Sequence, residues 1–161
     1  MEIRYARTDE LPEILDIYAN ARAFMRENGN LTQWQGGFPP RSLLESDIAQ
    51  CKLYVCVSDG TIACVFYYAV EQDPTYGKID GPGWLSDAPY GVIHRIAAAQ
   101  TVRGAATFCI QWAVRRSGNL RMDTHRDNIP MRSLLKKLGF TPCGKIYLSD
   151  GSPRYAYQKR L

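Results

Sequence analysis

The dipeptide Asp59-Gly60 separates two β-rich runs and constrains the fold more than any other short feature. The runs extend from Lys52 to Ser58 and from Thr61 to Tyr68, and both are rich in aromatic and β-branched residues. One common type of two-residue hairpin turn needs positive φ at both of its residues. An Asp-Gly pair between such runs favours this turn, because Asp and Gly tolerate positive φ better than most residues. We therefore expect an antiparallel hairpin formed by these two runs.

The other periodic segments place helices and strands around this hairpin. We expect strands at residues 3–6, 90–98, 120–124, 141–148 and 154–159, and helices at about 11–26, 43–51, 105–114 and 128–138. Residues 72–89 form a long irregular stretch, and loops of this length are often functional. The order mixes antiparallel hairpins with two strand–helix units, which predicts an α/β fold: a mixed, mostly antiparallel sheet with helices on both faces.

The composition is typical of one globular domain and excludes several classes of protein. The 161 residues match the size of a single domain, so residues 1–161 are interpreted as one unit. A net charge of +4 without a clustered basic stripe argues against nucleic-acid binding. No signal peptide and no apolar run of roughly 20 residues is present, so we expect a cytoplasmic protein that does not bind membranes. The five scattered cysteines form no C-x-x-C pair, and no residues have metal-ligand spacing, so we expect reduced thiols and no metal.

Residues 93–107 are the most informative segment for function. A strand leads through a tight turn into a helix that opens with Arg103, Gly104, Ala105 and Ala106. Small side chains at a helix N-terminus let a ligand approach free backbone N–H groups, and the helix dipole favours an anion. Arg103 can add a charge-assisted hydrogen bond. Alternatively, the glycine and alanines only allow the helix to pack closely on the sheet.

With this segment the sequence resembles the GCN5-related N-acetyltransferase (GNAT) superfamily, over nearly the whole chain and in the form of its small bacterial members. The family signature is Gln/Arg-x-x-Gly/Ala-x-Gly/Ala, and its backbone amides hold the pyrophosphate of coenzyme A. Arg103 and Ala106 match it, whereas Phe108 replaces the last small residue and can narrow the turn. The resemblance implies acetyl-CoA as cosubstrate, bound by Arg103, Gly104, Ala105, Ala106 and Thr107.

A second block of resemblance runs from the strand at 120–124 through Asn128 to Gly139-Phe140. It implies that Asn128 hydrogen-bonds the pantetheine arm, and that the fourth strand edges a gap where the fourth and fifth strands splay apart. The other residues that it assigns to the cosubstrate are Ile96, Ala97 and Ala98 on that strand and Met131, Leu134 and Leu135 on the following helix. From spacing alone, Asn128 fits a helix cap equally well, and the apolar residues fit a core.

The resemblance implies direct transfer of an acetyl group to a primary amine of a small molecule or peptide. The candidate general base is His94, because an imidazole pKa of about 6.5 suits proton removal near neutrality. Glu71 and Asp123 are lesser candidates, and His94 also fits a core histidine. A fourth-strand N–H near Ala97 is expected to stabilise the oxyanion.

The position seven residues after the Asn, where many family members have a general-acid Tyr, is Leu135 in this sequence. Three alternatives follow: Tyr147 or another tyrosine of the closing strands is the acid, no acid is needed, or the protein does not catalyse. Tyr147 also fits a packed strand aromatic. For the acceptor pocket the candidates are Trp34, Tyr68, Trp84 and Tyr90, with Tyr76 beside them; each of them also fits an anchoring aromatic.

Two rival functions remain at this stage. Leu135 favours a non-catalytic acyl-CoA-binding sensor of the same fold. The basic residues Arg132, Lys136 and Lys137 suggest a nucleic-acid-binding helix, but their spacing mixes faces and fits a solvated surface. Weak homodimers are common in the family, so the resemblance leaves a homodimer open.

Overall fold

The hairpin predicted around Asp59-Gly60 is present in the computed structural model, which describes all residues from 1 to 161. β2 (Leu53–Ser58) pairs antiparallel with β3 (Thr61–Val70), and Asp59 and Gly60 adopt φ values of 50° and 76°. Positive φ at both positions is the backbone that this type of tight turn requires. The turn therefore sets the pairing of Ser58 with Thr61 and of Val57 with Ile62, and the register shifts between Val57 and Cys56.

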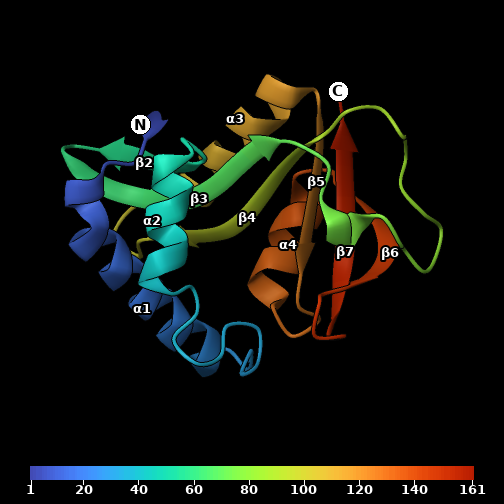
Figure 1. Cartoon of the computed structure of the whole chain (residues 1–161), viewed down its shortest axis with the longest axis horizontal. Coiled ribbons are helices and arrows are strands. Elements are labelled where there is room, and N and C mark those ends of the chain that lie inside the picture. The colour runs from blue at the N-terminus through green and yellow to red at the C-terminus, as the bar shows by residue number, and fades with distance from the viewer.

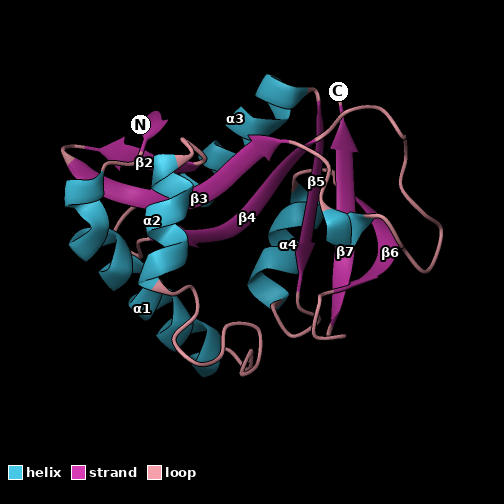
Figure 2. Cartoon of the chain, in the orientation of Figure 1, coloured by secondary structure: helices cyan, strands magenta, loops and turns pink.

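The remaining strands and helices follow the predicted order, and their ends differ by a few residues (Figures 1 and 2). The strands are β1 (Glu2–Tyr5), β4 (Gly91–Ala98), β5 (Asn119–Thr124), β6 (Thr141–Tyr147) and β7 (Pro153–Arg160); the helices are α1 (Leu11–Glu27), α2 (Arg41–Ala49), α3 (Ala105–Ser117) and α4 (Ile129–Lys137). The seven-stranded sheet has the order β1-β2-β3-β4-β5-β7-β6. Only β4 and β5 are parallel, which confirms the mixed, mostly antiparallel α/β fold.

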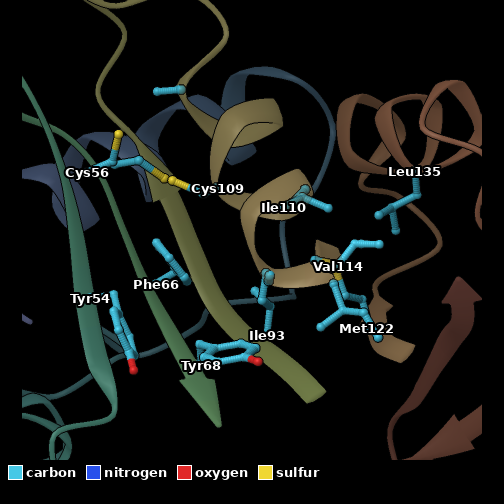
Figure 3. Packing of buried hydrophobic residues seen from close by; sticks show 14 of the residues in the cluster. Tyr54, Cys56, Phe66, Tyr68, Ile93, Cys109, Ile110, Val114, Met122 and Leu135 are labelled. Atoms are coloured by element: carbon cyan, nitrogen blue, oxygen red, sulfur yellow. The ribbon is translucent and has the colours of Figure 1, made fainter. Parts of the chain in front are cut away.

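Helices cover both faces of the sheet. α1 and α2 pack on one face through an apolar cluster that includes Ile14, Leu44 and Val65. α3 and α4 pack on the other face, where Ile110 and Leu135 belong to a cluster that also contains Phe66 and Met122 of the sheet (Figure 3). The apolar face of each helix thus packs on the sheet, with one core under α1 and α2 and a second core under α3 and α4, as amphipathic helices on a sheet require.

β4 and β5 pair only where they begin. Gly91 lies opposite Leu120 and Val92 opposite Arg121, and no pairing continues beyond them. In Figure 1 the two strands diverge from this point, β4 running with β3 and β5 with β7. Farther along β4, beyond His94, its register on β3 shifts at a β-bulge where Arg95 has a φ of 51°. The edge of β4 that faces β5 is therefore unpaired from Ile93 onward.

The long loop after β3 crosses the outside of the C-terminal strands. Its Asp80 forms a two-residue bridge with Lys145 of the edge strand β6. Close approach depends on Gly144, where an added Cβ would lie 2.2 Å from the Asp80 carbonyl oxygen. No helix of the fold has the length and apolar character of a bilayer span. All five cysteines are free thiols, and four of them are buried.

Candidate active site

Two pockets lie along the unpaired part of β4. The larger has a volume of about 660 Å³ and is bounded by residues 93–96 of β4 and 122–124 of β5, the loop between α1 and α2, and the β6–β7 turn. The smaller has a volume of about 300 Å³ and surrounds the first turn of α3. The larger, mostly polar cavity and the pocket at the helix N-terminus therefore lie beside successive parts of β4 and the turn that follows it.

His94 lies in the larger cavity between two carboxylates. Its Nε2 is 2.6 Å from Oδ2 of Asp73, and its Nδ1 is 3.8 Å from Oδ1 of Asp123. Asp73 comes from the long loop after β3, and Asp123 from β5. The side chain of His94 is 23% exposed, so it is not a core histidine and can reach a ligand.

The protonation state of Asp73 indicates which nitrogen of His94 carries the proton. Burial raises the pKa of Asp73, but hydrogen bonds from His94 and Thr75 outweigh it and lower the pKa to about 2. At neutral pH Asp73 is therefore an acceptor only, and Nε2 of His94 must donate to it. Nδ1 is then the basic atom of the neutral ring, and it faces Asp123.

Aromatic residues of the long loop hold the two carboxylates in place. The hydroxyl of Tyr76 donates to Oδ1 of Asp123 at 2.5 Å, and the backbone N–H of Asp73 donates to the Tyr90 hydroxyl at 2.9 Å. The ring of Tyr76 packs in a tilted arrangement against Trp84, whose indole N–H donates to the Tyr76 carbonyl oxygen. The loop is thus a support for the acidic side of the cavity.

Asp73→Asn is expected to remove a pH-dependent part of the stability. The folded-state pKa of about 2 lies below the usual value of 3.8, so the carboxylate stabilises the fold above about pH 4, and this stabilisation is lost as the pH falls toward 2. The free energy of unfolding of the unmodified protein should therefore exceed that of Asp73→Asn by up to about 2 kcal/mol at pH 7, and the two free energies should converge at low pH. Urea unfolding at pH 7, 5 and 3 measures the difference; a difference that does not change with pH would contradict this expectation.

The smaller pocket is formed by the predicted phosphate-binding turn. Its walls come from Ala98 to Gln100 of β4 and the following turn, the five residues from Arg103 to Thr107, and Leu134 of α4. Gly104 precedes α3 with a φ of 79°, and no side chain caps the helix. The first amides of α3 are therefore without an intrahelical or side-chain acceptor, which fits a diphosphate. Phe108 packs against the α3–α4 core instead and does not narrow this pocket.

Asn128 caps α4, as the cap interpretation predicted. Its Oδ1 accepts from the N–H of Met131, while its Nδ2 donates to Oε1 of Gln33. Gln33 also accepts from the buried Asn30, and its carbonyl oxygen lies 3.5 Å from the guanidinium of Arg154. The α1–α2 loop is thus joined to α4 and β7 on the side of the cavity that Asn128 lines.

The apolar residues assigned to a pantetheine tunnel lie in three different environments. Met131 lines the larger cavity and Leu134 the smaller one, so this face of α4 lies beside both. Leu135 is fully buried in the α3–α4 core, where Figure 3 shows it near Met122 and Val114, and it lines neither pocket. Leu135 directly follows Leu134, and one step along a helix turns the side chain by about 100° around the helix axis, here toward the sheet.

The β4 residues of the predicted edge also differ in orientation. The N–H of Ala99 donates to the carbonyl oxygen of Ala63 on β3, and hydrogen bonding alternates along a strand. The amide of Ala97 therefore faces β3 rather than the splay, so an oxyanion donor near Ala97 would have to be a neighbouring amide. The amide of Ala98 faces the splay. Ile96, beside the bulge, lines the larger cavity.

Of the predicted acceptor aromatics, only Trp34 lines the cavity. Tyr68 points to the other face of β3 and packs against Trp112 in the core (Figure 3). Trp84 and Tyr90 enclose the guanidinium of Arg121, at 4.2 and 3.9 Å from their ring centres, and anchor the long loop. The pocket assignment of these three was wrong, because strand alternation and loop packing direct their side chains elsewhere.

Tyr147 lies on the edge strand β6, outside the cavity, and the neighbouring Asp80 carboxylate raises its pKa. No tyrosine lines either pocket. The prediction of Tyr147 as a general acid is therefore not supported by its position. Likewise Glu71, a lesser base candidate, is paired with Lys52 and Tyr67.

Three residues of the site were missed by sequence reasoning: Asp73, Gln33 and Arg154. Each belongs to a loop or strand end that carries no motif, and each reaches the cavity only through tertiary packing. Asp73 carried one usable signal, since it lies within the long loop that the sequence marked as functional. Histidine, cysteine and acidic residues gather nowhere in a group of three suited to a metal ion.

Comparisons with known proteins agree with this geometry. No protein-family model and no curated protein matches the chain. Among solved structures, a GNAT-family acetyltransferase from Streptococcus agalactiae is 32% identical, with a TM-score of 0.90 over 99% of this chain and 95% of its own. Two further structures support the fold alone: a GNAT-family acetyltransferase from Listeria monocytogenes (19% identity, TM-score 0.72, 99% and 94% covered) and a ribosomal-protein-alanine N-acetyltransferase from Brucella melitensis (18%, 0.63, 100% and 100%).

The splayed sheet with a helix N-terminus at the end of the splay is an acetyltransferase fold, and it implies an acyl-CoA cosubstrate. The chain belongs to the GNAT family of acetyltransferases.

Proposed function

We propose that the protein is an acetyl-CoA-dependent N-acetyltransferase that acts as one domain and passes the acetyl group directly to a primary amine of a small molecule or peptide. The observation that carries this proposal is the placement of His94. It is oriented by Asp73 in a cavity bounded by the unpaired edge of β4. The uncapped turn at Arg103 lies between the end of β4 and the start of α3.

Acetyl-CoA supplies the acetyl group as a thioester. The amides opening α3 and the side chain of Arg103 hold the diphosphate. The free backbone edge of β4, including the amide of Ala98, pairs with the pantetheine arm as it would with an added strand. Met131 and Leu134 line the two pockets beside that arm, and a backbone N–H of β4 near Ile96 would donate a hydrogen bond to the oxyanion that develops on the thioester oxygen.

His94 and Asp123 act on the amine. The carboxylate of Asp123 attracts the ammonium group, and Nδ1 of His94, directed toward the same point, accepts its proton. The free amine then forms the new C–N bond while the C–S bond breaks, and the second proton that the nitrogen must lose goes to the departing thiolate, which leaves as the free thiol of coenzyme A. Asp73 acts as a positioning residue because it fixes the ring and stabilises the imidazolium that forms.

The leaving group is the thiolate of coenzyme A. It departs without a tyrosine acid, because Leu135 is buried in the core and no tyrosine lines the cavity. The absence of that acid is also the observation that favours the alternative function, a sensor that binds acyl-CoA without turnover.

Two measurements test the proposal. Calorimetry with acetyl-CoA tests binding, and release of free thiol in the presence of a panel of amines tests transfer. Binding together with acetylated product supports the enzyme. Binding without product from any amine would favour the sensor, and absence of binding would overturn both.

A further inference from the structure

Arg154 is a buried cation in the larger cavity that has no carboxylate partner. It lies on β7, is 7% exposed, and lines the cavity. Its guanidinium donates only to backbone carbonyl oxygens, those of Pro153 at 2.9 Å and Gln33 at 3.5 Å. A guanidinium has five N–H donors, and a buried charge is costly unless an opposite charge accompanies it.

The other shielded arginines of the fold have partners of the expected kind. Arg95 forms a 2.5 Å ion pair with Asp47. Arg121 also has no carboxylate partner, but it is enclosed between two aromatic rings, donates to the Ser86 carbonyl oxygen and lines neither pocket. Two carboxylates, Asp123 and Asp150, act electrostatically on Arg154, but neither forms an ion pair with it. Asp123 accepts a hydrogen bond from Tyr76, and Asp150 accepts one from Ser152. Burial lowers the pKa of Arg154, and these two carboxylates only partly oppose this. Arg154 is thus a cation without a counterion.

The register of β5 on β7 sets the position of Arg154 relative to Asp123, the carboxylate that faces His94. Asp123 of β5 lies opposite Ala156 of β7, and Arg154 precedes Ala156 by two residues. Residues that pair directly, and residues two apart on a strand, project from the same face. Arg154 and Asp123 therefore lie on one face of the sheet, with backbone positions about 7 Å apart along the strand.

We propose that the acceptor is a small amine that also carries a carboxylate, such as an amino acid, whose carboxylate binds Arg154 while its amine lies between Asp123 and His94. This inference rests on the proposed acetyl transfer and names the class of its acceptor. A guanidinium suits the purpose, since it binds a carboxylate through two parallel hydrogen bonds. Trp34 and Met25, which line the same cavity, provide apolar surface for the remainder of the molecule.

The test compares each acceptor with its neutral isostere. The twenty L-amino acids, β-alanine and γ-aminobutyrate are assayed beside their carboxamides, with acetyl-CoA and release of free thiol as the readout. We expect kcat/KM for at least one acid to exceed that for its carboxamide by about 10- to 100-fold. This is the factor that loss of a hydrogen bond between two charged groups usually causes. Equal rates for acids and carboxamides, or turnover of only peptide amines, would overturn the inference without affecting the proposed transfer.

Variants test the same point through the protein. Arg154→Gln should lower kcat/KM for the preferred acid by about 10- to 100-fold, leave its carboxamide within about threefold, and leave the Kd for acetyl-CoA unchanged. Arg154→Lys keeps the charge and should retain part of the preference. The matched control is Arg126→Gln, an exposed arginine outside the cavity. Equal losses for acid and carboxamide in both Arg154 variants would show a structural role and overturn the inference. The comparison in the unmodified protein decides the case if the variants do not fold.

Discussion

His94→Gln is expected to lower kcat for acetyl transfer by about 10²- to 10⁴-fold, the usual contribution of a general base. The glutamine amide can still donate to Asp73, whose oxygen lies 2.6 Å from the histidine nitrogen, so the loop stays anchored. What is lost is Nδ1, the atom facing Asp123 and the incoming amine. Steady-state kinetics with a saturating amine measures the loss.

The Kd for acetyl-CoA provides the internal control for this variant. His94 does not line the pocket around the first turn of α3, so calorimetry should give the same affinity as the unmodified protein. A kcat within about fivefold of that protein would contradict the assignment of His94 as base and make Asp123 the next candidate. A parallel loss of acetyl-CoA affinity would indicate a structural role.

Ala106→Glu is expected to weaken acetyl-CoA binding by more than about 100-fold. Ala106 lines the pocket at the uncapped start of α3, where the proposed diphosphate lies. A carboxylate there repels the phosphates and itself occupies the favourable end of the helix dipole. Because acids near a helix N-terminus stabilise the helix, the variant should fold normally. Calorimetry and thermal unfolding measure the two effects separately.

Gln111→Glu is the matched control, since it adds the same charge to an exposed position of the same helix, away from the pocket. It should leave the Kd for acetyl-CoA unchanged. If Ala106→Glu also binds acetyl-CoA normally, the cosubstrate does not use this turn, and the proposed direction of the thioester along β4 is wrong.

Local sequence signals determined the fold almost completely. Asp59-Gly60 predicts the central hairpin because few residue pairs tolerate positive φ twice in succession, and the apolar periodicity of residues 11–26 predicts α1. The uncapped turn around Gly104 was also predicted, because small residues after a strand are visible in one short segment. The differences are confined to element ends such as α3, which continues to Ser117 because Arg115 and Arg116 extend it beyond its apolar run.

The direction of side chains could not be obtained in this way. Leu135 was assigned to the site by the resemblance and Tyr68 as an aromatic on a strand face, but one step along a strand or helix points a side chain to another face, and both are buried in the core. Trp84 and Tyr90 were assigned as acceptor aromatics, whereas packing around Arg121 makes them supports of the loop that carries Asp73.

The chain by itself determined which helices and strands form and their order along the sequence, because each of these depends on residues close together in sequence; the cosubstrate followed only from the resemblance to a family. Only the tertiary structure decided that Asp73 orients His94 and that Arg154 lies without a counterion in the same cavity as Asp123. Those groups are 21 or more residues apart in sequence, and the divergence of β4 from β5 is what brings them to one cavity.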